Sequence, residues 1–102
     1  MITTHVLNLA SGNPAAGIEV ELSIQMEGNW QKLGSGTTDT DGRINNLLEP
    51  GHELQNGIYQ LTFQVDDGFY SLIPIQFKVT EKRHYHVPLL LSPYGYSTYR
   101  GS

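Results

Sequence analysis

Four histidines, together with Arg43 and Arg100, are the side chains of this 102-residue sequence best suited to acid–base chemistry. His84 and His86 are separated by one residue, so on a strand their rings point the same way, roughly 6–7 Å apart. Imidazole exchanges a proton near neutral pH, and arginine donates paired hydrogen bonds to planar, carbonyl-rich molecules. These residue types predict a site where an arginine polarises a carbonyl group while a histidine moves protons.

Each of these residues also has a simpler interpretation. Strand alternation places His5 on the same face as Leu7, where a lone histidine is commonly a core-edge residue bonded to a backbone carbonyl. His52 lies in a polar turn and is expected to be solvated. Arg43 follows two aspartates and could form a surface ion pair with Asp39 or Asp41. A binding role for Arg43 is favoured because the sequence also holds several histidines and Arg100, although it is poor in basic groups.

Two other chemistries fit the sequence less well. The His84/His86 pair could serve a zinc ion with His5 as a third ligand, but no carboxylate is clearly paired with it. Serine nucleophile chemistry has candidates in Ser92, Ser97 and Ser102, yet the nucleophile-elbow pattern is missing from the sequence. The carboxylate of Ser102 could instead orient an imidazole. We therefore expect proton transfer without a metal.

The last nine residues, Tyr94 to Ser102, are unusually rich in aromatic side chains. They hold three of the ten aromatic residues and Arg100, whereas chain ends usually carry small or polar residues. Tyrosine and arginine are well suited to binding planar, polar partners. This segment is therefore expected to be part of a site.

Length and composition limit the remaining possibilities. The chain predicts one domain, residues 1–102, with no cysteine for a disulfide or a thiolate nucleophile. The net charge of −4 and the scattered basic residues argue against nucleic acid, and no apolar run approaches membrane-spanning length. The first residues do not resemble a signal peptide, so a cytoplasmic protein is expected. A leader or targeting segment outside the sequence would make it periplasmic or peroxisomal.

Hydrophobic residues recur with a period of two. This alternation predicts half-buried strands separated by turns rich in glycine, proline, asparagine and aspartate. About eight short strands at this spacing predict an all-β antiparallel sandwich. The expected strands are Thr3–Leu9, Ile18–Met26, Trp30–Thr37, Arg43–Leu47, Tyr59–Val65, Ile73–Thr80, Tyr85–Leu91 and Tyr94–Arg100.

Several segments together resemble the 5-hydroxyisourate hydrolase family, which is related to transthyretin. The matching segments are His5-Val6-Leu7, Gly12-x-Pro14-Ala15, Asp41-Gly42-Arg43, His84-Tyr85-His86-Val87-Pro88-Leu89-Leu90-Leu91-Ser92-Pro93 and the terminal Tyr99-Arg100-Gly101-Ser102. The resemblance implies a transthyretin-like sandwich of two four-stranded antiparallel sheets. It also implies a homotetramer, a dimer of dimers, with active sites in the channel between the dimers.

The resemblance further implies a reaction. Family members open the six-membered ring of 5-hydroxyisourate by hydrolysis in urate degradation, giving 2-oxo-4-hydroxy-4-carboxy-5-ureidoimidazoline without a metal or organic cofactor. The catalytic positions fall on His5, Arg43 and His86, and a further substrate-contacting position falls on Tyr99. His84, Arg100 and Ser102 are expected to support the site.

We hypothesise that these residues divide the reaction between them. His86 would deprotonate the attacking water and Arg43 would stabilise the oxyanion. His5 would position the substrate or protonate the leaving nitrogen.

One departure from the family pattern and two other functions complete the interpretation. Val65 to Ile73 is too short for the helix that family members carry between the fifth and sixth strands, so this helix is expected to be missing. The turn pattern also occurs in non-catalytic β-sandwich binding modules, and a transthyretin-like carrier could use the same channel without turnover. Neither of these alternatives needs the histidines together with the terminal Tyr-Arg-Gly-Ser.

Overall fold

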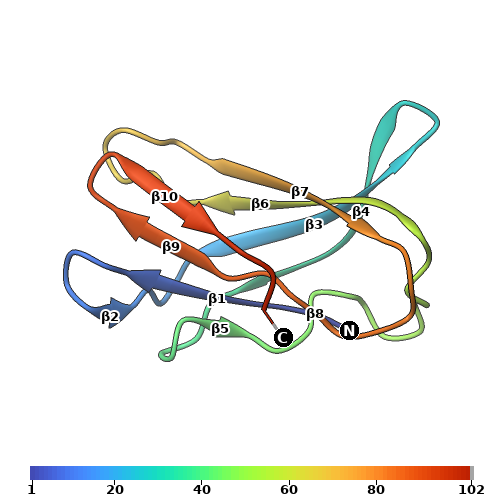
Figure 1. Cartoon of the computed structure of the whole chain (residues 1–102), viewed down its shortest axis with the longest axis horizontal. Helices are drawn as coiled ribbons and strands as arrows, with labels where there is room; N and C mark the ends of the chain where they lie inside the picture. Colours follow the sequence, from blue (N-terminus) through green and yellow to red (C-terminus); the bar gives the residue numbers. More distant parts are fainter. Residues whose placement is uncertain (102) are drawn as a thin grey trace.

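The computed structural model of the protein describes residues 1–101, in which two β-sheets pack face to face (Figure 1). In chain order, the strands are β1 (Ile2–Asn8), β2 (Asn13–Pro14), β3 (Glu19–Met26), β4 (Asn29–Thr37), β5 (Arg43–Ile44), β6 (Gly57–Gln64), β7 (Ile73–Val79), β8 (Tyr85–His86), β9 (Leu89–Ser92) and β10 (Gly95–Thr98). This arrangement confirms the predicted all-β sandwich. Within the described residues, no helix is long and apolar enough to cross a membrane.

One sheet is regular and antiparallel, with the strand order β4-β3-β6-β7. Its strands have seven to nine residues and pair along nearly their full length, with one irregularity between Leu22 and Ser23. The alternation predicted for β3 holds over its first half, where Val20 and Leu22 are buried while Glu19 and Glu21 face solvent. It is wrong at Ser23, which is buried next to the irregularity, and at Met26, which is 43% exposed. The regular pattern of the sequence therefore gives a regular sheet.

The other sheet has six strands and is mixed, which corrects the prediction of two four-stranded antiparallel sheets. Its main path is β10-β9-β1-β2, and β5 and β8 also pair with β1. β1 runs parallel to both β8 and β9. Alternation tells which side chains share a face but not the direction of a neighbour, and no hairpin links β1 to these distant strands. The parallel pairing could therefore not be read from the pattern.

Two predicted strands of this sheet are shorter than expected. The strand predicted over Tyr85–Leu91 is divided into β8 and β9 at Pro88, which has no N–H to donate. The strand predicted over Arg43–Leu47 ends after Ile44. Beyond Ile44 the Asn46 side chain, not a backbone carbonyl, accepts two of the hydrogen bonds. Its Oδ1 accepts from the backbone N–H of Ile2 at 3.3 Å and of Leu48 at 3.2 Å.

The core lies between the two sheets. It is made of aliphatic and aromatic side chains from both of them, the most deeply buried being Ile2, Val6, Val20, Leu22, Ile24, Leu47, Tyr59, Leu61, Phe63, Ile73, Val79 and Leu89. The hydroxyl of Tyr59 donates a hydrogen bond to the Gln55 carbonyl at 2.6 Å, so this buried polar atom is satisfied.

A tight loop joins β6 to β7, as predicted from the short connection between them. Backbone hydrogen bonds run from Asp66 N to the Ser71 carbonyl and from Asp67 N to the Tyr70 carbonyl, both at 3.1 Å. The Asp67 carboxylate accepts two more, from the N–H groups of Phe69 and Tyr70. Among residues 1–101 there is no helix, so the expected loss of the helix at this position is confirmed.

Candidate active site

The central strand β1 presents Thr3 and His5 on the outer face of the mixed sheet. Ile2, Thr4 and Val6, which alternate with them, are at most 1% exposed and point into the sandwich. The interpretation of His5 as a core-edge histidine is therefore wrong, because the core face of this strand is the other one. His5 is half-buried on an outward surface where a small molecule could reach it.

A turn before β5 places Arg43 directly opposite His5. The two residues are antiparallel register partners, so their side chains lie on the same face. The Asp39 carboxylate shapes the turn by accepting hydrogen bonds from the N–H groups of Asp41 at 2.9 Å and Arg43 at 3.0 Å. The turn formed by the Asp-x-Asp-Gly-Arg sequence therefore places Arg43 beside β1.

Gly42 is required for this approach. Its φ of 75° is left-handed, and a Cβ here would overlap the Val6 carbonyl oxygen and lie 3.0 Å from Cβ of Pro14. Its own carbonyl accepts a hydrogen bond from Val6 N at 2.7 Å. Only glycine lets the turn lie this close to β1.

The guanidinium group of Arg43 forms no ion pair with another residue of the described part of the chain. The ion pairs found among residues 1–101 join Lys32 to Glu21, and Arg83 and Arg100 to Glu81, and none of them involves Arg43. The surface ion pair considered for Arg43 is therefore not formed. Asp39 acts on the backbone of the turn instead.

The parallel pairing of β1 with β8 brings His86 beside Thr3, its register partner. Thr3 Oγ1 lies 2.7 Å from His84 Nε2 and 2.8 Å from His86 Nδ1. The centroids of the two imidazole rings are 6.3 Å apart, within the separation expected from their spacing in sequence. His84 is exposed, whereas His86 is half-buried.

These side chains border a hollow of about 400 Å³ on the outer face of the mixed sheet. It is lined by Met1, Thr3, Thr4, Arg43, Asn45, His84 and His86. His5 lies at its margin as the register partner of Arg43. The hollow thus combines the guanidinium group of Arg43 with imidazoles, which is the combination that can bind an oxyanion and move protons.

The environment of His86 disfavours its protonated form. Burial lowers the pKa of its imidazole below the ordinary value of 6.5, and the positive charge of Arg43 lowers it further, followed by His84 and His5. A neutral imidazole can accept a proton at pH 7. The electrostatics of the site therefore suit His86 to the role of a general base.

Gly101 packs against the ring of His86. Its N–H donates a hydrogen bond to the His86 carbonyl at 2.8 Å. A Cβ at this position would overlap His86 Cδ2 and lie 3.0 Å from Cγ. The terminal Tyr-Arg-Gly-Ser segment thus contributes through its glycine, which the sequence analysis left without a role.

Thr3 and Asn45 are also site residues that the sequence analysis missed. Thr3 lies two residues before His5, and Asn45 lies two residues after Arg43. On a strand, residues two apart share a face, so this spacing was the signal that could have found them.

The other predicted site residues lie away from the hollow. Tyr99 is 56% exposed and lines a neighbouring hollow of about 210 Å³, which it shares with Tyr85, Arg100 and His86. Arg100 lies over the Tyr85 ring, 5.7 Å from its centroid, and pairs with Glu81. Ser102 lies outside the described residues. In a single copy of the chain, therefore, the structure joins His5, Arg43, His84 and His86 in one place, and Tyr99 and Arg100 share only the neighbouring hollow with His86.

The histidines do not converge as metal ligands. Across residues 1–101, no three His, Asp or Glu side chains are grouped closely enough to hold a metal ion. The zinc arrangement of His5, His84 and His86 considered above therefore lacks the geometry it needs.

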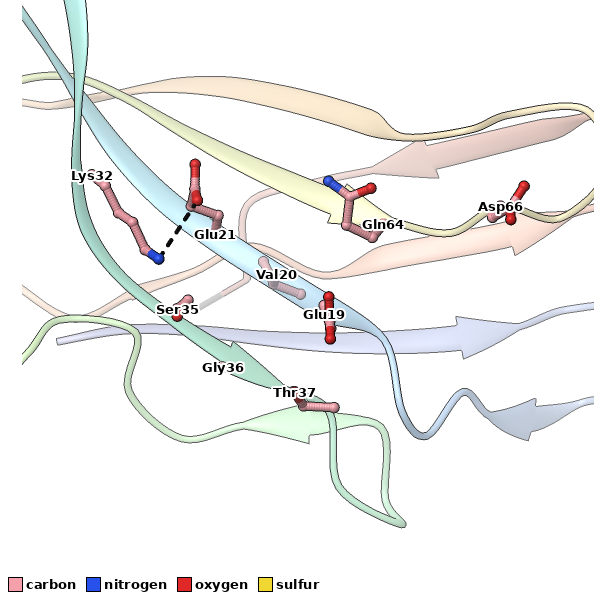
Figure 2. A pocket seen from close by; sticks show the side chains of 9 residues that line it. All are labelled: Glu19, Val20, Glu21, Lys32, Ser35, Gly36, Thr37, Gln64 and Asp66. Carbon is pink, nitrogen blue, oxygen red and sulfur yellow. Dashed lines mark ion pairs between the residues drawn. The ribbon is translucent and has the colours of Figure 1, made fainter.

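A larger hollow, of about 570 Å³, lies on the outer face of the regular sheet (Figure 2). Its ionisable side chains are Glu19, Glu21, Asp66 and Lys32, and Lys32 pairs with Glu21 at 3.8 Å. Three carboxylates repel an electron-rich, carbonyl-bearing molecule. The smaller hollow with Arg43 is therefore the better candidate for a site of this chemistry.

The fold is a transthyretin-type sandwich, and its mixed sheet carries a histidine–arginine cluster on the outer face. The model of the HIUase/Transthyretin family matches residues 2–101. A 5-hydroxyisourate hydrolase of Mesorhizobium japonicum is 43% identical over 114 residues, covering 99% of this chain and 91% of the relative. The chain belongs to the HIUase/Transthyretin family, as the sequence analysis predicted.

Solved structures agree with this assignment. The 5-hydroxyisourate hydrolase of Klebsiella pneumoniae has a TM-score of 0.82 and 34% identity, covering 99% of this chain and 98% of that one. Sea bream transthyretin, solved in complex with thyroxine, has a TM-score of 0.88 and 25% identity, covering 98% and 93%. Both branches of the family therefore share this fold.

Proposed function

We propose that this protein is a 5-hydroxyisourate hydrolase that opens the six-membered ring of its substrate in urate degradation. The observation that carries the proposal is the register of β1, which sets Arg43 opposite His5 and His86 beside Thr3. This arrangement supplies a cationic hydrogen-bond donor and imidazoles on one outward face. The hydrolase names of the related proteins agree with it.

In the proposed reaction, His86 acts as the general base. Its Nε2 accepts a proton from a water molecule, and the water oxygen attacks the ring carbonyl carbon. The guanidinium group of Arg43 donates hydrogen bonds to the oxyanion that forms on the carbonyl oxygen. The lowered pKa of His86 supports this role, because burial and the charge of Arg43 keep its imidazole unprotonated.

The second half of the reaction breaks the ring carbon–nitrogen bond. The oxyanion collapses to a carboxyl group, and the leaving nitrogen takes a proton from His5. The product of this step is 2-oxo-4-hydroxy-4-carboxy-5-ureidoimidazoline, and all the atoms come from substrate and water. The position of His5 opposite Arg43 supports the role, since a substrate carbonyl bound at Arg43 would hold its neighbouring ring nitrogen near His5.

The test is to generate 5-hydroxyisourate with urate oxidase and follow its decay by ultraviolet absorbance. The wild-type protein is expected to accelerate the decay above the spontaneous rate. Arg43→Gln should reduce kcat/KM by about 100-fold or more, the usual effect of losing an oxyanion donor. Arg83→Gln, which removes an arginine paired with Glu81, should retain wild-type rates. Saturable binding without acceleration would support a carrier instead.

We also propose that the protein assembles as a homotetramer. β10 and β7 are each one of the two edge strands of their sheets and lie along the same side of the sandwich (Figure 1). Tyr94, Tyr96 and Tyr99 are each at least 40% exposed at this side. Unpaired strand edges and exposed aromatic side chains are suited to association. Light scattering coupled to size exclusion should give a mass near four times 11.4 kDa, whereas a monomer mass would reject the proposal.

A further inference from the structure

Thr3 joins the two neighbouring histidines of the site. Its hydroxyl oxygen is within hydrogen-bond distance of both His84 Nε2, at 2.7 Å, and His86 Nδ1, at 2.8 Å. Thr3 is only 9% exposed, while His84 lies in solvent. The three side chains therefore form a short path from the half-buried His86 to the surface.

The single hydroxyl proton of Thr3 makes the tautomers of His84 and His86 depend on each other. A threonine hydroxyl carries one proton, so it can donate to only one of the two imidazole nitrogens. The other nitrogen must then present an N–H to the hydroxyl oxygen, or the contact is lost. If His86 donates from Nδ1, its Nε2 carries the lone pair that a general base needs. If Thr3 donates to His86 Nδ1 instead, the neutral ring holds its proton on Nε2 and cannot accept one from water.

Resting on the hydrolase function proposed above, we propose that Thr3 is a positioning residue that holds His86 in the Nδ1–H form and relays the proton taken from water to His84. When His86 Nε2 gains a proton from water, Nδ1–H passes its proton to Thr3 Oγ1. The hydroxyl proton passes to His84 Nε2. His86 is left neutral with its proton on Nε2, Thr3 keeps one hydroxyl proton, and His84 becomes the imidazolium. The Nδ1–H form of His86 is restored when its Nε2 proton leaves to solvent and the proton on His84 Nε2 returns through Thr3.

The charges around the site favour this direction. A positive charge on His86 is disfavoured by its burial and by Arg43, His84 and His5, the groups that lower its pKa. Moving the charge to the exposed His84 places it in water, where charges are screened. Arg43 thus remains the main cation near the developing oxyanion.

The experiment compares Thr3→Val, which keeps the shape but removes the hydroxyl, with Thr3→Ser, which keeps the hydroxyl. Thr62→Val on β6 of the other sheet is a matched control. The first readout is the ¹⁵N NMR signal of the His86 ring in the free protein, which reports which nitrogen carries the proton. The second is kcat, KM and the dependence of kcat on the fraction of D₂O.

Thr3→Val is expected to lose the preference for Nδ1–H at His86. Its kcat should fall about 10- to 100-fold with KM nearly unchanged, the scale seen when a functional histidine loses its orienting hydrogen bond. The wild type should show a curved dependence on D₂O fraction, since several protons move together, and Thr3→Val a linear one. Thr3→Ser should restore all three properties, and Thr62→Val should leave them unchanged.

A second variant, His84→Gln, tests the relay even if Thr3→Val fails to fold. In His84→Gln the side-chain amide can still face Thr3 but cannot take up a proton. The relay predicts a linear D₂O dependence and a lowered kcat with the Nδ1–H form of His86 intact. An unchanged kcat and a curved D₂O dependence in His84→Gln would overturn the relay, as would an unchanged His86 ring signal in Thr3→Val. If the wild-type protein fails to hydrolyse 5-hydroxyisourate, the proposed function falls, while the NMR signal alone still tests the link from Thr3 to His86.

Discussion

The two sheets of the sandwich differ in regularity and in the chemistry of their outer faces. The sheet β4-β3-β6-β7 has long antiparallel strands and a hollow with three carboxylates and one lysine. The mixed sheet has strands as short as two residues, parallel and antiparallel pairs, and a smaller hollow with Arg43, His84 and His86. The less regular sheet is the one that carries the candidate site.

The difference shows why short strands suit a site. A long hairpin fixes its side chains as one continuous ladder, whereas β5 and β8 each pair with β1 over only two residues. Two short segments can therefore approach β1 from separate parts of the chain and each deliver one functional side chain. The regular sheet supplies the rigid partner against which this assembly packs.

The largest expected effect tests the regular sheet as a source of stability. Phe63 on β6 is fully buried, so Phe63→Ala should lower the free energy of unfolding by about 3–5 kcal/mol through loss of buried surface and a cavity. Denaturant unfolding measures this change, and kcat per folded molecule should stay at the wild-type value. Met26→Ala on β3, where the side chain is 43% exposed, is the control, with a cost below about 1 kcal/mol. A large fall in kcat for fully folded Phe63→Ala would contradict the view that the regular sheet supplies stability and not chemistry.

The next effect tests the mixed sheet as the source of chemistry. His86→Gln removes the proposed general base and should reduce kcat by about 100-fold or more. Its stability should change far less than in Phe63→Ala, because the side chain is only half-buried. The ultraviolet assay measures the rate, and His52→Gln, in an exposed turn, is the matched control. Equal rates for the two variants would remove His86 from the mechanism.

A smaller effect is expected at Gly101. Gly101→Ala would place a methyl group against His86 Cδ2 and 3.0 Å from Cγ, so the ring and the chain end must move apart. A displacement of a catalytic group of this kind costs roughly 10- to 100-fold in kcat. Gly95→Ala is the control, since its added methyl group meets only the flexible Ser92 hydroxyl at 3.2 Å. The His86 ring signals in NMR should shift for the first variant and not for the second.

The smallest effect concerns the protonation of His86. Its folded-state pKa is lowered, first by burial and then by Arg43, so the unfolded chain binds this proton more readily than the folded one. The contribution of His86 to the free energy of unfolding is therefore complete above pH 6.5 and is lost as the pH falls below it.

Arg43→Gln removes one cause of this shift, so the pKa of His86 should rise toward 6.5. An NMR titration of the His86 ring measures the change without substrate. Lys32→Gln in the hollow of the regular sheet should leave the titration unchanged. A fall in the His86 pKa in Arg43→Gln would show that Arg43 does not act on His86 as the structure indicates.

The sequence predicted the regular sheet better than the mixed one. Alternation over Ile18–Met26 predicted β3 to within one residue, because each side chain of a half-buried strand reports its own face. The same alternation placed His84 and His86 on one side. It could not tell which strand lies next to β1, nor in which direction that strand runs.

The missed parts of the site have the same physical origin. Thr3 matters because two distant imidazoles meet its hydroxyl, and Gly101 matters because the His86 ring occupies the space of a Cβ. Both depend on contacts between distant parts of the chain, which composition and periodicity do not contain. Resemblance to a family supplied His5, Arg43 and His86 as candidates, and the register of β1 supplied their geometry.

The pairing of β1 with β8 also has a consequence for the order of folding. Thr3 is separated from His84 by 81 residues and from His86 by 83, so these contacts close nearly the whole chain into one loop. Contacts of such long range form late, after the local hairpins of the regular sheet have reduced the entropy of the chain between them. In a refolding experiment, recovery of activity should therefore lag behind formation of the hairpins. Recovered activity would then show that the entire sandwich has formed.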